Sequence, residues 1–527
     1  MKKMSFLVIL ASLAAMIAAI TVIGPVLSSQ ALAQTQPQQP PEYKDVVAAS
    51  RIQDLAAKLK ELERIKAAYP NTQYMATIDG WILAARIDLS DTLDAVLGLQ
   101  KDFLAKAKGA DRVQGPFMSA DQVISHPKVL TFDKAKVLAA ILGYKEAVTK
   151  AMGEADSLQG IPPDQQKSFK TYFQSGIDVF VAQAQLNVGD PAKALASLES
   201  YRAAGGAADG QYSFVEAQAN AKLGKTKEAY EGFMRAAAEN YPNSVENAKA
   251  LYAKLNGNAD GFEAILEAKV KALPFHPEPF KPGAAWKGKA VLAEIFTGSE
   301  CPPCVAADLG FDGLIEAYPL KYVAVLEYHL PIPRPDPIMN PATKKRQDYY
   351  AVNSTPTVFF DGEKKIGGGG SRGMAEAKFK DYKAEVDARV NTAPAVVLGV
   401  KAARTGDVVK VDCTVDKAAP GVEYNVVLVQ GEEKYKGSNG IVFHKLVVRD
   451  LAVIDPAGTK TASFDLAASE LAADAYLTDF EKTSTRFPNF KFPERHAKID
   501  RAKLRVVFFV QEKESKKVLN SVVADVK

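Results

Sequence analysis

Cys301-Pro302-Pro303-Cys304 is the stretch that decides how the middle of this sequence folds. It follows an apolar run, Ala290–Phe296, with the character of a β-strand, and it precedes Val305–Tyr318, whose apolar spacing is typical of a helix. Two thiols within one helical turn can close a disulfide with little rearrangement. The stretch therefore predicts a strand–turn–helix unit with a dithiol where the helix begins.

The residues around this unit continue the alternation of strands and helices. We predict further elements at Tyr322–Tyr328 (strand), Pro341–Val352 (helix), Thr357–Asp361 (strand) and Met374–Val390 (helix). This alternation is typical of an α/β domain, which we place at residues 289–391.

Toward the C-terminus the apolar residues recur with a period of about two, which indicates strands. The region 395–527 is predicted to be an all-β sandwich. Its expected strands are Val396–Ala402, Val408–Val415, Glu423–Gln430, His444–Val453, Thr459–Phe464, Leu504–Gln511 and Lys517–Val526.

Upstream of the dithiol, residues 45–273 show helical periodicity, and a Pro-rich linker at 274–288 follows them. The stretch Gly109–Pro127 contains helix breakers and is predicted to be a loop. An internal repeat with an offset of 35 residues pairs Ala182, Gly189, Ala194 and Leu198 with Ala217, Gly224, Ala229 and Phe233. Over Lys170–Leu255 the pattern resembles tetratricopeptide repeats. Such repeats present a concave surface to protein partners; a purely structural helical domain is the alternative.

The N-terminus has the pattern of an export signal. Lys2 and Lys3 precede the apolar stretch Phe6–Leu27, and Ala31-Leu32-Ala33 supplies small residues for cleavage. We therefore expect a signal peptide at residues 1–33, a disordered linker at 34–44, and a periplasmic or secreted protein without a later membrane span. An uncleaved anchor is the alternative.

Overall composition limits the remaining function classes. The net charge of +4 over 527 residues gives no case for a nucleic-acid partner. Three cysteines, two of them in one motif, do not make a disulfide-stapled scaffold, and Cys413 is expected to be a packed thiol.

The dithiol has a chemistry that follows from its place on the helix. Helix N-termini favour a thiolate, so Cys301 is predicted to be an exposed nucleophile that attacks a substrate disulfide. Cys304, one turn further and more buried, would then resolve the mixed disulfide. Thr355-Pro356-Thr357 precedes a short strand, and a proline there suits a cis peptide bond that presents backbone groups to an extended substrate.

These features resemble the thioredoxin-like superfamily over Lys289–Val390. The resemblance implies that Cys301 attacks, Cys304 resolves and Pro356 is the cis-proline, with a reversible Cys301–Cys304 disulfide. It further implies that Thr355, with Pro302 and Pro303, contacts the substrate, and that Glu294 lies near the family's buried proton-transferring acid, although offset by one residue. The tryptophan often found before the first cysteine is replaced by Glu300, and Leu330–Pro337 reads as an insertion at the rim of the site.

The C-terminal region carries a second resemblance. Lys436-Gly437-Ser438-Asn439-Gly440, followed by His444–Asp450, is similar to bacterial envelope proteins that join a thioredoxin-like fold to a β-sandwich. The functions of that group are mostly unassigned, so this resemblance implies architecture rather than activity.

The sequence leads us to expect a multidomain, exported thiol–disulfide oxidoreductase without cofactor or metal. It would act on protein disulfides as a reductase or isomerase with an unknown electron donor. Pro302 and Pro303 lack N–H groups that could stabilise a thiolate, and Glu300 adds negative charge, so we expect a reducing rather than strongly oxidising pair.

Other readings of the motif remain open. A lone CxxC can be half of a zinc site, but no second motif is present, and His276 and His329 lack ligand spacing. The pair can also be a static structural disulfide. The remaining alternative is a non-enzymatic envelope assembly protein, in which the repeats and the sandwich bind partners.

Overall fold

The computed structural model describes residues 40–527 except 41, 51, 160, 162, 283–285 and 418–419. The predicted signal peptide at 1–33 lies outside the described residues, and so does most of the predicted linker at 34–44. The chain divides into two compact units, with the boundary in the sequence between Phe233 and Met234. Among the helices of the described residues, none is long and apolar enough to cross a membrane.

The first unit is built from helices. Aspartate and threonine side chains accept hydrogen bonds from backbone N–H groups where several of them begin, which explains these start points. The helices are α2 (Tyr43–Ser50), α3 (Leu55–Ala68), α4 (Met75–Asp88), α5 (Leu93–Leu104), α6 (Asp111–Ile124), α7 (Lys134–Met152), α8 (Pro163–Asn187), α9 (Pro191–Ala203), α10 (Gly210–Lys222) and α11 (Thr226–Ala238), the last of which crosses into the second unit.

The predicted helical repeat is present as successive helix pairs, α8 with α9 and α10 with α11. Gly189 and Gly224, which are equivalent in the repeat, both have positive φ angles of 89° and 75° at the turns between paired helices. Within the second pair, a Cβ atom on Gly232 would lie 2.9 Å from the Cβ of Ala217. Small residues therefore allow α10 and α11 to approach closely.

The prediction of a loop over Gly109–Pro127 was wrong, because α6 occupies most of it. Val113, Phe117, Ala120 and Val123 recur at helical spacing and are buried in one apolar cluster. Burial of this face outweighs the internal Pro116, which removes one backbone donor.

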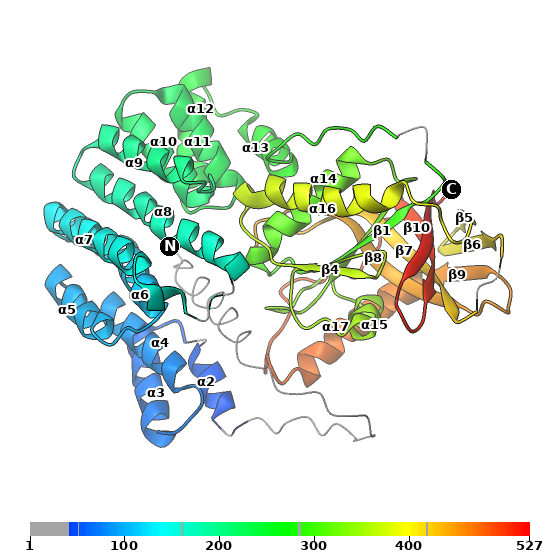
Figure 1. The fold of residues 1–527 in the computed structure, drawn as a ribbon, viewed down its shortest axis with the longest axis horizontal. Coiled ribbons are helices and arrows are strands. Elements are labelled where there is room, and N and C mark those ends of the chain that lie inside the picture. Colours follow the sequence, from blue (N-terminus) through cyan, green and yellow to red (C-terminus); the bar gives the residue numbers. More distant parts are fainter. Residues whose placement is uncertain are drawn as a thin grey trace. The chain divides into compact units, whose positions relative to one another are not determined.

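The second unit contains helices around a large sheet (Figure 1). Its helices are α12 (Ser244–Asn256), α13 (Phe262–Lys271), α14 (Val305–Ala317), α15 (Pro341–Tyr350), α16 (Ala375–Val390) and α17 (Leu466–Thr483). Its strands are β1 (Val291–Thr297), β2 (Val323–His329), β3 (Thr357–Phe360), β4 (Lys364–Gly367), β5 (Leu398–Thr405), β6 (Val408–Val415), β7 (Val422–Lys434), β8 (Phe443–Ile454), β9 (Thr461–Asp465), β10 (Leu504–Glu512) and β11 (Val518–Asp525).

One eight-stranded mixed sheet runs through both the predicted α/β region and the predicted β region, in the order β11-β10-β7-β8-β2-β1-β3-β4. Strands β1 and β2 are parallel, and every residue of both is buried, as their nearly continuous apolar sequences require. The two regions join where β2 pairs with β8, in parallel, at Glu327 and Val447. The predicted multidomain class, with helical, α/β and β-rich regions, is confirmed.

A second sheet, β5-β6-β9, provides the other layer of the β-rich region. Val409 and Val411 from β6 share a buried cluster with Val426 from β7 and Phe508 from β10. The sequence did not predict α17, which follows β9 directly and is capped by Asp465, whose carboxylate accepts from the Ala468 N–H.

Helices cover both faces of the large sheet. Figure 1 shows α14 and α16 over one face and α15 and α17 over the other. The predicted linker residues Phe275 and Phe280 also pack on this core, against Phe379 and Tyr318 respectively. The dithiol at the start of α14 is thus held at one end of a fully covered sheet.

Candidate functional site: the dithiol turn

Cys301 and Cys304 form a disulfide at the start of α14. Both residues are fully buried, so the expectation that Cys301 is exposed was wrong for this disulfide form. The Thr355 hydroxyl lies 3.4 Å from the Cys301 sulfur and donates to the Ile332 carbonyl at 2.8 Å. Thr355, held by the Ile332 carbonyl, therefore lies against the sulfur that was expected to face substrate.

The backbone donors around the disulfide are mostly committed elsewhere. Pro302 and Pro303 have no N–H, and the Cys304 N–H donates to the Cys301 carbonyl at 3.0 Å. One turn later, the Ala306 N–H donates to the Gly370 carbonyl at 3.0 Å. None of these donors is available to a thiolate on Cys301.

The run of glycines at residues 367–370 forms one wall of the site. The Gly370 N–H donates to the Pro303 carbonyl at 2.7 Å, so Gly370 is hydrogen-bonded to the start of α14 through both its N–H and its carbonyl. At Gly369 a Cβ atom would lie 1.8 Å from the Pro303 oxygen. The glycine run was not among the predicted site residues; its glycines allow this close approach of two backbone segments.

The Thr355–Pro356 peptide bond is cis, and Pro356 is buried while Thr355 is half-exposed. Pro302 is also half-exposed, and Pro303 is exposed beside it. The structure thus brings together five of the seven predicted site residues (Pro302, Pro303, Thr355 and the two cysteines), with Pro356 adjoining them.

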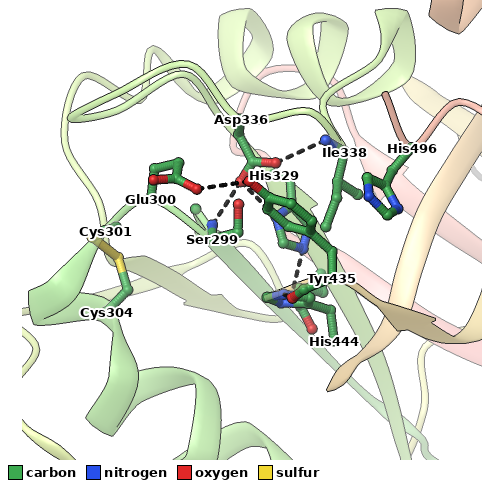
Figure 2. Close-up of polar contacts among 12 residues, drawn as sticks. Ser299, Glu300, Cys301, Cys304, His329, Asp336, Ile338, Tyr435, His444 and His496 are labelled. Carbon is green, nitrogen blue, oxygen red and sulfur yellow. Dashed lines mark hydrogen bonds and ion pairs between the residues drawn. A yellow bond between two sulfur atoms is a disulfide. The ribbon is translucent and has the colours of Figure 1, made fainter. Parts of the chain in front are cut away.

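The loop between β7 and β8 supports the residues that precede the dithiol (Figure 2). The Tyr435 hydroxyl donates to Glu300 Oε1 at 3.0 Å, and the Ser438 N–H approaches the same oxygen at 3.3 Å. The Asn439 N–H donates to the Ser299 carbonyl at 3.1 Å. The β-rich region therefore contributes directly to the site, which the sequence analysis had not foreseen.

The predicted insertion Leu330–Pro337 lies at the same end of the sheet. The Leu330 N–H donates to the Thr297 carbonyl at 2.9 Å. Asp336, buried at the end of the insertion, accepts from the Ser299 N–H at 2.6 Å and from the Ile338 N–H at 2.8 Å. Hydrogen bonds to its carboxylate and the neighbouring His329 hold the pKa of Asp336 low despite its burial.

Glu294 is the predicted site residue that the structure places apart from the dithiol. Its carboxylate is fully buried and accepts from Arg346 at 2.7 and 2.9 Å and from the Tyr350 hydroxyl at 2.7 Å. Both partners lie on α15, which covers the face of the sheet opposite α14 (Figure 1). No hydrogen bond of the described residues links Glu294 to Cys304, and its proton-transfer role stays a prediction.

A set of buried ionisable groups on the α14 side of the sheet was not predicted as part of the site. Asp308 lies on α14 one turn after Cys304, and burial raises its pKa well above the ordinary value. Glu327 and His329 lie on β2, and His444 lies on β8. The signal available in the sequence was the i, i+2 spacing of Glu327 and His329, which places both side chains on one face of a strand.

Two cavities accompany these features. One of about 120 Å³ adjoins the dithiol turn and is lined by Pro302, Val305, Arg372 and Asn439, among others. The other, of about 730 Å³, lies in the first unit between α7, α8 and α9, where Lys145 and Asp178 form an ion pair at 2.5 Å.

Comparisons with known proteins add little to this geometry. No protein-family model and no curated protein matches the chain. Among solved structures, HBP35 of Porphyromonas gingivalis matches at 14% identity, over 46% of this chain and 76% of that one, with a TM-score of 0.31. A likeness at that level carries no functional argument.

Proposed function

We propose that this chain is an exported thiol–disulfide oxidoreductase whose residues 289–391 form a thioredoxin-like domain. The observation that carries the proposal is the Cys301–Cys304 pair at the start of α14, with the Thr355 hydroxyl 3.4 Å from the Cys301 sulfur. Export is proposed from the basic and apolar pattern of residues 2–33.

The reaction follows from the chemistry of the pair. In the reduced form, the Cys301 thiolate attacks one sulfur of a substrate disulfide; that bond breaks, and the other sulfur leaves as a thiolate that takes up a proton. The Cys304 thiolate then attacks Cys301 and releases the second substrate thiol. Two electrons pass to the substrate, and a dithiol donor of unknown identity regenerates the reduced pair.

Reduction of insulin by the full chain tests this function. Wild type with dithiothreitol should precipitate insulin faster than dithiothreitol alone, and Cys301→Ser should abolish the difference. Cys413→Ser is the matched control, because Cys413 is buried in β6 and burial raises its pKa to about 12. Equal rates for wild type and Cys301→Ser would contradict the proposal, and mixed disulfides trapped by Cys304→Ser would identify the substrate.

The N–H groups of Cys304 and Ala306 donate to backbone carbonyls and so do not stabilise a thiolate on Cys301, which further supports a low reduction potential for the pair. Equilibration against glutathione should give a potential well below roughly −120 mV, the value of a strong oxidant whose thiolate is heavily stabilised. A potential near that value would contradict this part of the proposal.

A second candidate function rests on the first unit. The 730 Å³ cavity of the first unit is lined by polar and charged side chains of α7, α8 and α9. We propose that it receives a protein segment, as concave repeat surfaces do. Charge reversal at Lys170, which lines the cavity, should then weaken partner capture without affecting insulin reduction.

A further inference from the structure

Behind the dithiol, three buried side chains converge from neighbouring strands. Glu327 and His329 lie on β2 and His444 on β8, the strand that pairs with β2. One possible ligand atom from each lies within 4.8 Å of the others, and the three residues are at most 6% exposed. The pairing of β2 with β8 brings the three side chains together, because Glu327 and His329 share one face of β2 and His444 lies on the adjacent strand.

The proton positions on the two histidines are constrained by their outer partners. His444 Nε2 lies 3.0 Å from the Tyr435 carbonyl, which can only accept, so Nε2 carries a hydrogen. His329 Nδ1 lies 2.9 Å from Asp336 Oδ2, which also accepts (Figure 2). Neutral His444 therefore aims the lone pair of Nδ1 inward, and neutral His329 does the same with Nε2 when its proton lies on Nδ1.

These inward nitrogens meet a third acceptor. Glu327 Oε1 lies 2.8 Å from His329 Nε2 and 3.5 Å from His444 Nδ1. An ionised carboxylate and two imidazole lone pairs repel one another in a buried site unless protons or a cation lie between them. The positive charge between these groups is supplied either by a second proton on His329 or by a bound cation.

A fourth acceptor stands on the helix above. Neither oxygen of Asp308 has a hydrogen-bond partner of normal geometry among the described residues, although the nearby Thr297 hydroxyl favours its ionised form. Its strongest charge interaction is with Glu327, and His329 is another. On the same helix, Asp312 does have a cationic partner, because the Lys445 ammonium lies 3.3 Å from its carboxylate. A buried carboxylate without a partner is unusual and needs an explanation.

We propose that Glu327, His329 and His444 bind one zinc ion, with Asp308 as the fourth ligand. Imidazole and carboxylate donors in a closed, four-ligand set are typical of structural zinc. Bonds of about 2.0–2.1 Å at tetrahedral angles put ligand atoms about 3.3–3.4 Å apart. The Glu327–His444 separation of 3.5 Å is near this value, whereas Glu327 Oε1 and His329 Nε2, 2.8 Å apart, would move apart by about 0.5 Å on binding zinc.

The surroundings match those of a zinc site in two further respects. Both histidines donate their outer N–H groups, one to a carboxylate and one to a backbone carbonyl, which is the arrangement that orients zinc ligands. Two carboxylates would neutralise the divalent charge. The zinc would fasten β2 to β8 and α14, and through Asp336 it would fix Ser299, two residues before Cys301.

Zinc binding by the full chain with all three cysteines replaced by serine tests the proposal, because thiolate binding is then impossible. After removal of metal with a chelator, addition of ZnCl₂ should leave one zinc per chain after dialysis, and Co²⁺ should give the visible absorption of a tetrahedral N/O site. Binding should be lost in His444→Gln and weakened at least tenfold in Asp308→Asn. Asp336→Asn should weaken it about 10–100-fold.

His496→Gln is the matched control, since His496 pairs with Glu433 at 2.6 Å outside this cluster. If His444→Gln fails to fold, the test is thermal unfolding of the metal-free chain that retains His444. Zinc that binds the native state must raise the Tm of this chain as the zinc concentration increases. No bound zinc, an unchanged Tm, or equal binding by a folded His444→Gln would overturn the proposal. Any of these three results would mean that a doubly protonated His329, and not zinc, neutralises the carboxylates of Glu327 and Asp336.

Discussion

Gly369 leaves no room for a side chain beside the dithiol turn. A methyl group there would meet the Pro303 oxygen at 1.8 Å and the Pro356 ring at 3.0 Å. The Gly370–Pro303 hydrogen bond fixes this backbone, so the clash cannot be relieved by a flexible side chain. We expect Gly369→Ala to destabilise the second unit by about 1–3 kcal/mol, the usual cost of overpacking.

Urea unfolding, with the reduction assay as a second readout, checks this expectation. Gly458→Ala is the control, because its Cβ would make only ordinary contact, 3.5 Å from the Asp455 oxygen. A Gly369→Ala chain as stable and as active as the control would show that the glycine wall is not tightly packed.

At the residue scale the sequence indicated which side chains gather at the dithiol but not how they are enclosed. Cys301, Cys304 and Thr355 could be assigned together because their local motifs are short and specific. The burial of Cys301 could not be predicted, since its neighbour Thr355 comes from a segment 54 residues further along the chain. The His329–His444 contact was hidden for the same reason, because 115 residues separate them in the sequence.

At the scale of elements, α15 is fastened to β1 by one buried ion pair. Arg346 is 1% exposed and donates two hydrogen bonds to Glu294, which is fully buried. Gln511 on β10 also accepts from Arg346, at 2.8 Å. Removing one member of such a pair leaves an uncompensated buried charge.

We therefore expect Arg346→Ala to cost about 3–5 kcal/mol of unfolding free energy. Lys344→Ala, on the same helix but in an exposed pair with Asp348, should cost about 0–1 kcal/mol. Urea unfolding of both variants measures the difference. Equal losses would mean that α15 is held by its apolar contacts instead.

The elements themselves were largely predictable, because strong periodicity survives in any tertiary context. The strands β6, β7, β8 and β10 each begin within one residue of their predicted start. The helices α6 and α17 were missed, since α6 contains Gly115 and Pro116, and α17 directly follows a strand without a break in composition. In α6, burial of the apolar face outweighs these helix-breaking residues, and the extent of burial cannot be read from a single sequence.

For the whole molecule, the unexpected feature is the single sheet that joins the predicted α/β and β regions. Val448 from β8 and Phe509 from β10 belong to the same buried cluster as Val291 and Leu326. The side chain of Asn340 adds a hydrogen bond to the Val448 carbonyl at 2.8 Å. The dithiol thus depends on strands located more than 100 residues further along the chain.

This continuity predicts that the α/β region cannot fold without the C-terminal strands. A chain ending at Pro394 would expose the β2 edge and the apolar partners of β8 and β10, which favours unfolding or aggregation. Trp286 reports on this unit, because it packs on Tyr322 and donates to the Lys289 carbonyl at 2.9 Å. In a Trp81→Phe background, fluorescence comes from Trp286 alone, since the chain has two tryptophans. The full-length variant should show one cooperative urea transition in Trp286 fluorescence. The shortened chain should have the emission spectrum of an unfolded protein before urea is added. A cooperative transition of the shortened chain at an unchanged urea midpoint would instead establish an independent α/β domain.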